Sequence, residues 1–501
     1  MDTFLTWCNQ QGINYTHVDI KATEYSGHGL FLSTACNDST PLVHIPSHLL
    51  ITSTRLVANQ TTTKAFIDCL ETTLQPDSLP LEDRLRLPGN EKTCLRLFLA
   101  YEIHQSRTNT QPSSFWTTYI KNLPELSFFK ENHVLFLDPD SEEDGIFGLL
   151  QGTSMASSIR AKQANLQREW QRINELVSWD LTLEDWIYAD VLLWSRVVGL
   201  AKDGDDEGEL ALIPFFDFAN HRMDPNLRWQ LSEGGLDLVP FADTPIASGE
   251  ELCLSYGAKS NQELLFLHGF TLVDNPTDGQ VTMSLGPFLN PSMDHSSALK
   301  WKWMQQQDDP PFKPILVLAQ PTSGAVFGHS GWTSNSICMM YLAVLDEEDG
   351  LELKLVGGTD DDYDGTDNIS KAMQQLDIST TTTDPTVQLS INGKDIRSWK
   401  DLASGVLALY HAPVVQLRVT MMLLDASQYH LQQILSNNEL LAEETSDSTP
   451  PLYSHVVRYR EEERALLQQS VDVLTMVSEV LMENETVKEY LDEANAEADD
   501  G

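Results

Sequence analysis

The pattern of apolar and polar residues changes several times along the chain, and each change predicts a different kind of element. Residues 4–10 have the apolar spacing of a short helix, and Gly12 is expected to end it. Residues 16–33 predict a strand, a turn at 25–29 and a second strand. A further strand-like run covers 42–51. The chain therefore opens with short β elements.

From residue 91 the apolar positions recur at helical spacing. A largely buried helix is predicted over 91–104, and a polar one over 157–176. Thr182 and Asp185 resemble a capping box, with Asp in place of the usual Glu or Gln, and open another helix. Four residues at helical spacing are predicted to form its apolar stripe, namely Ile187, Val191, Trp194 and Val198.

Two segments in the middle of the chain combine apolar runs with polar ends. The stretch 211–221, ALIPFFDFANH, ends in Asn220 and His221. The stretch 250–257, EELCLSYG, places Tyr256 at the end of a short predicted strand. Either segment alone is more often an ordinary turn or a core tyrosine. The pair is more specific because GHGLF stands upstream, where two glycines permit positive φ and close backbone approach to a ligand.

The last part of the chain changes character again. A long apolar helical stretch covers 404–435, with a break expected near Pro413, and an amphipathic helix covers 461–482. The acidic, threonine-rich stretch 357–386 predicts a mobile loop. The acidic tail 493–501 is expected to fray.

Composition narrows the function. The chain has 32 Lys and Arg against 74 Asp and Glu, a net charge of −42. This charge repels phosphate backbones, so nucleic-acid binding is disfavoured, and a basic protein is the natural partner. An acidic chaperone for basic proteins would explain the charge alone. No P-loop, GxGxxG, GxSxG or HExxH motif is present.

Cysteine spacing and hydropathy suggest where the protein works. No two of the six cysteines lie within four residues of each other, which argues against CxxC zinc clusters and a dense disulfide framework. No apolar run approaches the ~18 residues of a membrane span, and the first residues have no secretory pattern. A soluble protein of the cytoplasm, the nucleus or both is expected, without membrane binding.

Taken together, these motifs resemble the SET-domain protein methyltransferases of the RuBisCO large-subunit methyltransferase-like subfamily. The similarity extends over most of the chain. It is carried by Gly27-His-Gly-Leu-Phe31, Ile45-Pro46, residues 97–102 with 115–124, Leu150-Gln-Gly-Thr153, Trp194-Ser-Arg-Val197, residues 211–221, residues 256–264 and residues 458–466.

The resemblance implies an α+β fold. A β-rich SET fold would hold an inserted helical subdomain, and a mostly α-helical C-terminal substrate-binding domain would follow. The implied divisions are an N-terminal SET part at 1–85, the helical insert at 86–195, the SET catalytic core at 196–275, the C-terminal domain at 280–492 and the acidic tail at 493–501.

The implied activity is S-adenosylmethionine-dependent protein N-methylation. The favoured target is a lysine of a basic non-histone protein, such as a ribosomal protein or elongation factor, and the enzyme is expected to be a monomer. Methylation of a protein histidine and a non-catalytic SET-derived binding scaffold remain alternatives. The reaction needs no metal, because the methyl group already sits on a positively charged sulfur and the amine attacks it in line. Desolvation in an apolar channel would supply the neutral amine.

The resemblance also assigns roles to single residues. Tyr256 would lie at the inner end of the channel and orient the amine and methyl groups, rather than act as a base. His268 stands where many relatives carry tyrosine. The positions implied to bind the cofactor are Gly27, His28, Gly29, Arg196, Asp217, Phe218, Ala219, Asn220, His221, His268 and Phe270.

Overall fold

A computed structural model of the 501-residue chain divides into two compact units. Unit 1 comprises Met1–Gly148, Met155–Thr277 and Ala442–Tyr459, and unit 2 comprises Leu149–Ser154, Asp278–Leu441 and Arg460–Gly501. The structure describes residues 1–23, 27–58, 64–75, 77–87, 89–108, 114–141, 145–200, 208–242, 245–321, 330–356, 386–441 and 450–499. The loop predicted at 357–386 lies almost entirely outside these residues.

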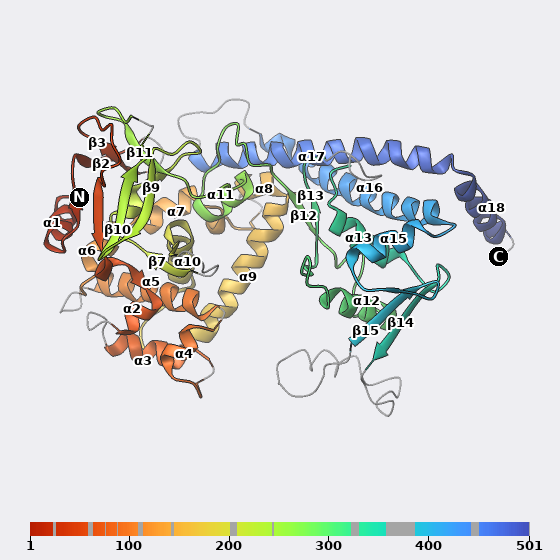
Figure 1. Ribbon diagram of the computed structural model, residues 1–501, viewed down its shortest axis with the longest axis horizontal. Coiled ribbons are helices and arrows are strands. Elements are labelled where there is room, and N and C mark those ends of the chain that lie inside the picture. Colours follow the sequence, from red (N-terminus) through yellow and green to blue (C-terminus); the bar gives the residue numbers. More distant parts are fainter. Residues whose placement is uncertain are drawn as a thin grey trace. The chain divides into compact units, whose positions relative to one another are not determined.

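Three small sheets form the β part of unit 1 (Figure 1). Their strand orders are β1-β4-β10-β9, β2-β3-β11-β8 and β5-β7-β6. The strand–turn–strand predicted over 16–33 is β2–β3. The strands are β1 (Asn14–Tyr15), β2 (Val18–Ala22), β3 (His28–Leu32), β4 (Val43–Pro46), β5 (Ile51–Thr52), β6 (Val198–Leu200), β7 (Glu209–Leu212), β8 (Asn220–His221), β9 (Leu227–Ser232), β10 (Gly235–Pro240) and β11 (Glu251–Leu254).

The helices of unit 1 are concentrated between β5 and β6 in the sequence. Helix α5 corresponds to the helix predicted over 91–104, and its residues 94–103 are all buried. The helices are α1 (Asp2–Gln10), α2 (Ser53–Ala58), α3 (Lys64–Thr73), α4 (Leu81–Leu85), α5 (Asn90–Thr108), α6 (Thr117–Ile120), α7 (Leu126–Asn132), α8 (Gly145–Leu150), α9 (Ser154–Asn174), α10 (Leu183–Arg196) and α11 (Asn261–His268), of which α8 and the start of α9 fall partly in unit 2.

Helix α10 begins as predicted but buries more of its surface than a single stripe. The Thr182 side chain accepts a hydrogen bond from the Asp185 amide at 3.0 Å, which caps the helix. The predicted stripe is wrong, because Val198 lies in β6, Trp186 is fully buried and the buried positions run over consecutive residues. Both sides of α10 face protein, since the buried Asp190 is paired with Arg96 of α5 at 2.6 Å.

Unit 2 combines helices with two small sheets that the sequence did not predict. Strands β12 (Val281–Ser284) and β13 (Ile315–Leu318) pair antiparallel, and β14 (Leu351–Val356), β15 (Thr386–Ile391) and β16 (Lys394–Ile396) form the other sheet. Its helices are α12 (His295–Gln305), α13 (Ser334–Val344), α15 (Trp399–Leu407), α16 (Ala412–Ser436), α17 (Pro451–Met482) and α18 (Glu485–Asp499), with the first residues of α17 assigned to unit 1.

Two predictions for this region can be compared directly. The break expected near Pro413 separates α15 from α16, and Pro413 stands in the first turn of α16, where it removes no needed hydrogen bond. The tail that the sequence predicts to fray belongs to helix α18, which continues to Asp499, and its fraying stays a prediction. Val487 anchors this helix, as it is fully buried in a small apolar cluster with Val414 and Leu417.

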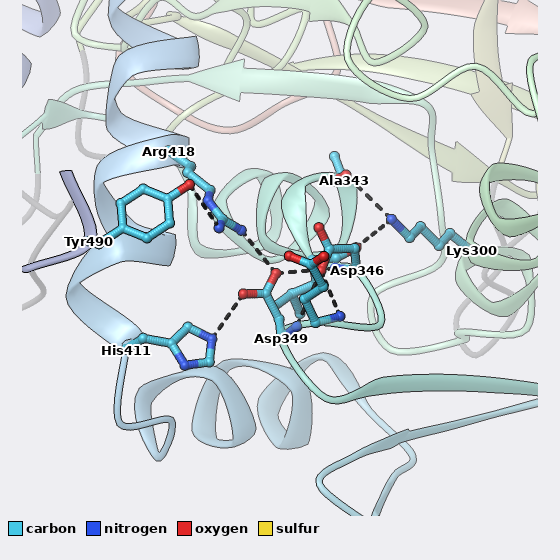
Figure 2. Close-up of polar contacts among 9 residues, drawn as sticks. Lys300, Ala343, Asp346, Asp349, His411, Arg418 and Tyr490 are labelled. Carbon is cyan, nitrogen blue, oxygen red and sulfur yellow. Dashed lines mark hydrogen bonds and ion pairs between the residues drawn. The ribbon is translucent and has the colours of Figure 1, made fainter. Parts of the chain in front are cut away.

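A buried carboxylate organises the polar interior of unit 2 (Figure 2). Asp349 is 3% exposed and pairs with Arg418 Nη1 at 3.0 Å and with His411 Nε2 at 2.9 Å. Arg418 also donates to the Tyr490 hydroxyl at 3.3 Å. The loop before β14 is therefore tied to α16 and, through Arg418, to α18.

Among the described residues, no single helix has the length and apolar character needed to cross a membrane. The bent pair Trp399–Leu407 and Ala412–Leu440 meets that criterion only when both helices are counted together, by length and composition.

Candidate active site

The site of unit 1 is built on a parallel strand pair. Strand β8 pairs with β11 in a register that sets Cys253 opposite Asn220 and Leu254 opposite His221. The Tyr256 amide, just beyond β11, donates to His221 Nδ1 at 3.1 Å. The two sequence segments that end in Asn-His and in tyrosine therefore meet side by side.

Asn220 links this strand pair to the glycine turn before β3. Its amide nitrogen donates to Glu251 Oε1 at 2.7 Å and to the His28 carbonyl at 3.3 Å. Gly29 lies against the same groups, since a Cβ atom there would overlap the Glu251 carboxylate and come within 3.0 Å of Asn220 Nδ2. Gly27 has φ 77, a conformation that favours glycine. The GHG sequence thus brings bare backbone next to Asn220.

The turn that leads into β8 is conformationally strained. Phe215 is fully buried with φ 73, which is unusual for a bulky residue. Its ring stacks on Tyr15 with centroids 5.0 Å apart, and this packing holds the backbone in place. Such strain persists only where the surroundings enforce it, and it often accompanies a functional site.

A buried carboxylate lies at the start of the segment. Asp217 accepts a hydrogen bond from the Tyr119 hydroxyl at 2.7 Å, and its Oδ2 lies 3.9 Å from Arg196 Nε. Burial raises the pKa of Asp217 to about 6, while Arg196 and Tyr119 act in the opposite direction. Within the described part of the chain, Asp217 Oδ1 and Arg196 Nε have no hydrogen-bond partner.

Tyr256 is fixed by its hydroxyl. This hydroxyl donates to the Ala219 carbonyl at 3.0 Å. Burial raises the pKa of Tyr256 above its ordinary value, so the phenol stays protonated at neutral pH. The tyrosine is thus a hydrogen-bonding and packing group rather than a base.

Tyr256 belongs to an aromatic cluster in which two imidazole rings lie against it and Phe270 lies near both of them. The centroid of His221 lies 5.1 Å from that of Tyr256, and the centroid of His268 lies 5.0 Å from it. Phe270 lies 6.2 Å from His221 and 6.0 Å from His268. Burial lowers the pKa of His221, and it lowers the pKa of His268 to about 3. Both imidazoles are therefore neutral at physiological pH.

The structure brings most of the sequence-predicted site residues into one connected region. Asn220 contacts the His28 backbone, Gly29 approaches Asn220, and the ring of His28 lies 6.2 Å from that of Phe218. Tyr256 bonds to the Ala219 carbonyl and lies against the His221 and His268 rings, and Phe270 lies near both of these imidazoles. Arg196 and Asp217 form an adjoining pair.

Several residues of the site had no signal in the sequence. Nothing in the sequence gives Tyr119 a polar role, yet its hydroxyl donates a hydrogen bond to Asp217. Glu251 holds the Asn220 amide. Asn226 donates to the Glu251 carbonyl at 2.8 Å and accepts from the Cys253 amide at 2.8 Å, so it supports β11 from the side. Their roles depend on contacts between distant segments.

Buried polar atoms without partners indicate that the region suits a polar ligand. Besides Asp217 Oδ1 and Arg196 Nε, the ring nitrogens His221 Nε2 and His268 Nε2 are buried without a hydrogen bond among the residues that the structure covers. Native proteins rarely leave such atoms unpaired, because each costs about 1–3 kcal/mol. One region thus offers a carboxylate, a guanidinium and two imidazoles beside bare glycine backbone.

Comparison with known proteins agrees with this arrangement. Residues 27–257, from the glycine turn to the residue after Tyr256, match the SET domain family model. The chain is 29% identical to SET domain-containing protein 8 of Schizosaccharomyces pombe over 41% of this chain and 44% of that protein. It is 26% identical to human actin-histidine N-methyltransferase over 38% of this chain and 32% of that protein.

Solved structures show the same fold over nearly the whole chain. The SET domain of LSMT bound to lysine and AdoHcy has a TM-score of 0.62 at 17% identity, covering 97% of this chain and 94% of that one. Rubisco LSMT bound to AdoMet has a TM-score of 0.61 at 16% identity, covering 96% and 92%. The chain therefore has a SET fold and is α+β overall. It spans less than half the length of the curated relatives named above.

Proposed function

We propose that this protein is an S-adenosylmethionine-dependent protein N-methyltransferase. The observation that carries the proposal is the β8–β11 pair, which joins Asn220 and His221 to Tyr256 next to the Gly27–Gly29 backbone. The SET fold and the match over residues 27–257 support the same reading.

The chemistry of the unpaired groups suits this cofactor. S-adenosylmethionine, when bound, supplies a methyl group on a positively charged sulfur, and it also carries an ammonium, a carboxylate and an adenine ring. The Asp217 carboxylate suits the ammonium, and the Arg196 guanidinium suits the carboxylate. Asn220, His221 and the glycine backbone would hold the amino-acid and adenine parts, and Phe218, Ala219 and Phe270 would provide packing.

Tyr256 would act by orientation. Because its hydroxyl is protonated and donates to the Ala219 carbonyl, the ring is held rigidly between His221 and His268. A rigid apolar wall excludes water and keeps the attacking nitrogen in line with the methyl group. The same desolvation favours the neutral form of an incoming amine.

We favour a lysine side chain as the target, with a protein histidine as the second candidate. Lysine is supported by the likeness to an LSMT structure that is described as bound to lysine. Histidine is supported by sequence relatives described as actin-histidine N-methyltransferases, at 26–27% identity over 38% of this chain. The net charge of −42 suits a basic protein substrate in either case.

A non-catalytic scaffold would have the same fold but would not bind the cofactor. It is less favoured, because the glycine turn, Arg196, Asp217, Asn220 and Tyr256 are all in place around unpaired polar atoms. An acidic chaperone would function equally well without Asn220 or Tyr256, so the effect of substituting those residues separates the readings.

The test is methyl transfer with radiolabelled S-adenosylmethionine to proteins of a cell extract, followed by mass spectrometry of labelled bands. Wild type should label at least one protein on lysine or histidine, and Tyr256→Phe should reduce labelling strongly. Tyr453→Phe, in the first turn of α17, is the matched control and should label as wild type does. Absence of labelling by folded wild type, in an extract that lacks its own enzyme of this kind, would contradict an enzymatic role.

A further inference from the structure

His268 occupies a fixed position at the end of α11. Gly269 follows it with φ 80 and ends the helix in the left-handed region. A Cβ atom at Gly269 would overlap the Asn132 carbonyl, so no side chain fits there and the backbone cannot easily shift. The His268 ring consequently has a defined place, 5.0 Å from the Tyr256 ring and 6.0 Å from the Phe270 ring.

One nitrogen of this ring makes no hydrogen bond to the residues that the structure describes. His268 Nε2 is buried and lacks a hydrogen-bond partner in the described ranges. Burial lowers the pKa of His268, and a hydrogen bond to the Ser195 backbone acts in the opposite direction, so a ring N–H donates that hydrogen bond to the Ser195 carbonyl. A neutral imidazole has a single N–H. Nε2 therefore presents a bare lone pair, an acceptor without a donor.

The surrounding residues do not supply that donor. The Tyr256 hydroxyl is directed to the Ala219 carbonyl, and His221 Nδ1 is occupied by the Tyr256 amide. Lys259, His133 and His221 are the titratable neighbours that lower the pKa of His268, which is an effect of charge rather than of hydrogen bonding. A donor from a bound molecule is needed to satisfy the nitrogen.

We propose that His268 Nε2 accepts a hydrogen bond from an N–H of the side chain that is methylated, and so positions the attacking nitrogen beside Tyr256. This rests on the proposed methyltransferase function. The sequence resemblance had grouped His268 with cofactor-binding positions, but its ring packs directly against Tyr256, the residue assigned to the reacting nitrogen.

A neutral acceptor suits this role better than a carboxylate would. It orients a nitrogen through its N–H while giving less stabilisation to the unreactive ammonium form of lysine. For a histidine target, holding one ring N–H presents the lone pair of the other ring nitrogen to the methyl group. In both cases an N–C bond forms as the S–C bond breaks, and the positive charge passes from sulfur to nitrogen. The surplus proton then leaves to water.

The chain offers a graded set of substitutions. His268→Phe keeps a flat ring but removes the acceptor, and His268→Gln restores an acceptor oxygen. His104→Phe is the control, because this histidine lies on α5 with its ring 5.1 Å from Trp179. The probes are two peptide libraries of equal composition, one with a single fixed lysine and one with a single fixed histidine. Binding of S-adenosylmethionine is measured on the same samples by calorimetry.

We expect His268→Phe to leave the affinity for S-adenosylmethionine within about twofold and to lower kcat/KM for the methylated library roughly tenfold, as expected for one lost hydrogen bond. His268→Gln should recover part of the rate, and the ratio of wild-type to His268→Phe rates should be constant with pH. His268→Phe should melt no lower than wild type, because it removes an unpaired buried nitrogen.

Three results would overturn the inference. Equal rates of methyl transfer by wild type and His268→Phe would show that His268 does not position the substrate nitrogen. The proposed function would remain intact. Loss of S-adenosylmethionine affinity in His268→Phe would assign the nitrogen to the cofactor instead. If wild type methylates neither library, the inference fails, and calorimetry on the same wild-type sample shows whether the proposed function fails with it.

Discussion

The hydroxyl of Tyr119 offers a direct way to test how the site controls Asp217. Tyr119→Phe removes only the oxygen that donates to Asp217 at 2.7 Å, and Tyr119 is 2% exposed, so water cannot easily replace it. Arg196 Nε, at 3.9 Å, is too far away to take over the hydrogen bond. The Asp217 carboxylate would then lose the hydrogen bond that Tyr119 donates to it.

The size of the effect follows from this contact. A hydrogen bond to a charged group contributes about 1.5–3 kcal/mol, which corresponds to a pKa change of about one to two units. The pKa of Asp217 is about 6 in the wild type. It should rise to between about 7 and 8 in the variant, because the removed bond stabilised only the ionised form.

The affinity of the variant for S-adenosylmethionine should then change with pH around the raised pKa of Asp217, which is a higher pH range than in the wild type. If ionised Asp217 binds the ammonium of the cofactor, the affinity of the variant should be lower roughly eightfold at pH 6.5 and almost unchanged at pH 8.5. Calorimetric titrations from pH 6 to 9 measure this directly. The wild type should lose affinity only as the pH approaches about 6.

A matched control exists in the same unit. Tyr188 is 6% exposed, and its hydroxyl donates to the Pro124 carbonyl at 2.6 Å, so Tyr188→Phe removes a comparable buried hydrogen bond that does not involve Asp217. It should leave the pH profile unchanged. Identical pH profiles for Tyr119→Phe and wild type would refute the reasoning.

Three further predictions concern stability and backbone approach. Burial holds the pKa of His133 at about 4, below its unfolded value, so its contribution to stability is present above pH 6.5 and is lost as the pH falls toward 4. When the pH is lowered from 7.5 to 5, the free energy of unfolding of His133→Asn, measured in urea, should therefore fall by about 2 kcal/mol less than that of wild type. Asp349→Asn should destabilise unit 2 by about 2 kcal/mol, measured as a lower urea midpoint, because the partly exposed His411 and Arg418 in Figure 2 lose the carboxylate that accepts their hydrogen bonds. Gly29→Ala should weaken S-adenosylmethionine binding at least tenfold by calorimetry, because the new methyl group overlaps Glu251.

Each of these has its own control or contradicting result. Equal losses of stability in His133→Asn and wild type between the two pH values would show that His133 does not titrate as described. Asp425→Asn changes an exposed carboxylate on the same helix as Arg418 and should not move the urea midpoint. Gly199→Ala adds a methyl group with nothing within 4 Å and should bind the cofactor as wild type does; equal binding by Gly29→Ala would contradict the close approach.

The sequence predicted those parts of the site that are encoded locally. The GHG turn leads into β3, the Asn-His pair forms β8 and Tyr256 follows β11, and such short apolar segments with polar ends are visible in the sequence pattern. Tyr119 could not be found this way, because it lies 98 residues before Asp217 and meets it only in the folded chain. The same holds for Asn226, whose side chain replaces strand partners along β11.

The errors in the fold have physical causes of the same kind. The stripe assigned to α10 assumed one buried face, but Asp190 is buried through pairing with Arg96 and Lys162, which no apolar period reveals. Strands β12 and β13 have four residues each, too short for an alternation to stand out. The charge of the C-terminal segment gives no sign of helix α18, which Val487 and Tyr490 hold by contacts with distant residues before Glu493.

The most direct test of the central claim is calorimetric binding of S-adenosylmethionine to wild type, Asn220→Ala and Asn290→Ala. Asn220 joins the glycine turn to β11, while Asn290 is an exposed loop residue whose side chain accepts one hydrogen bond at 3.0 Å from Ser292. We predict micromolar binding by wild type and Asn290→Ala, and binding at least tenfold weaker by Asn220→Ala. Absence of binding by correctly folded wild type would contradict the methyltransferase account and leave the scaffold reading.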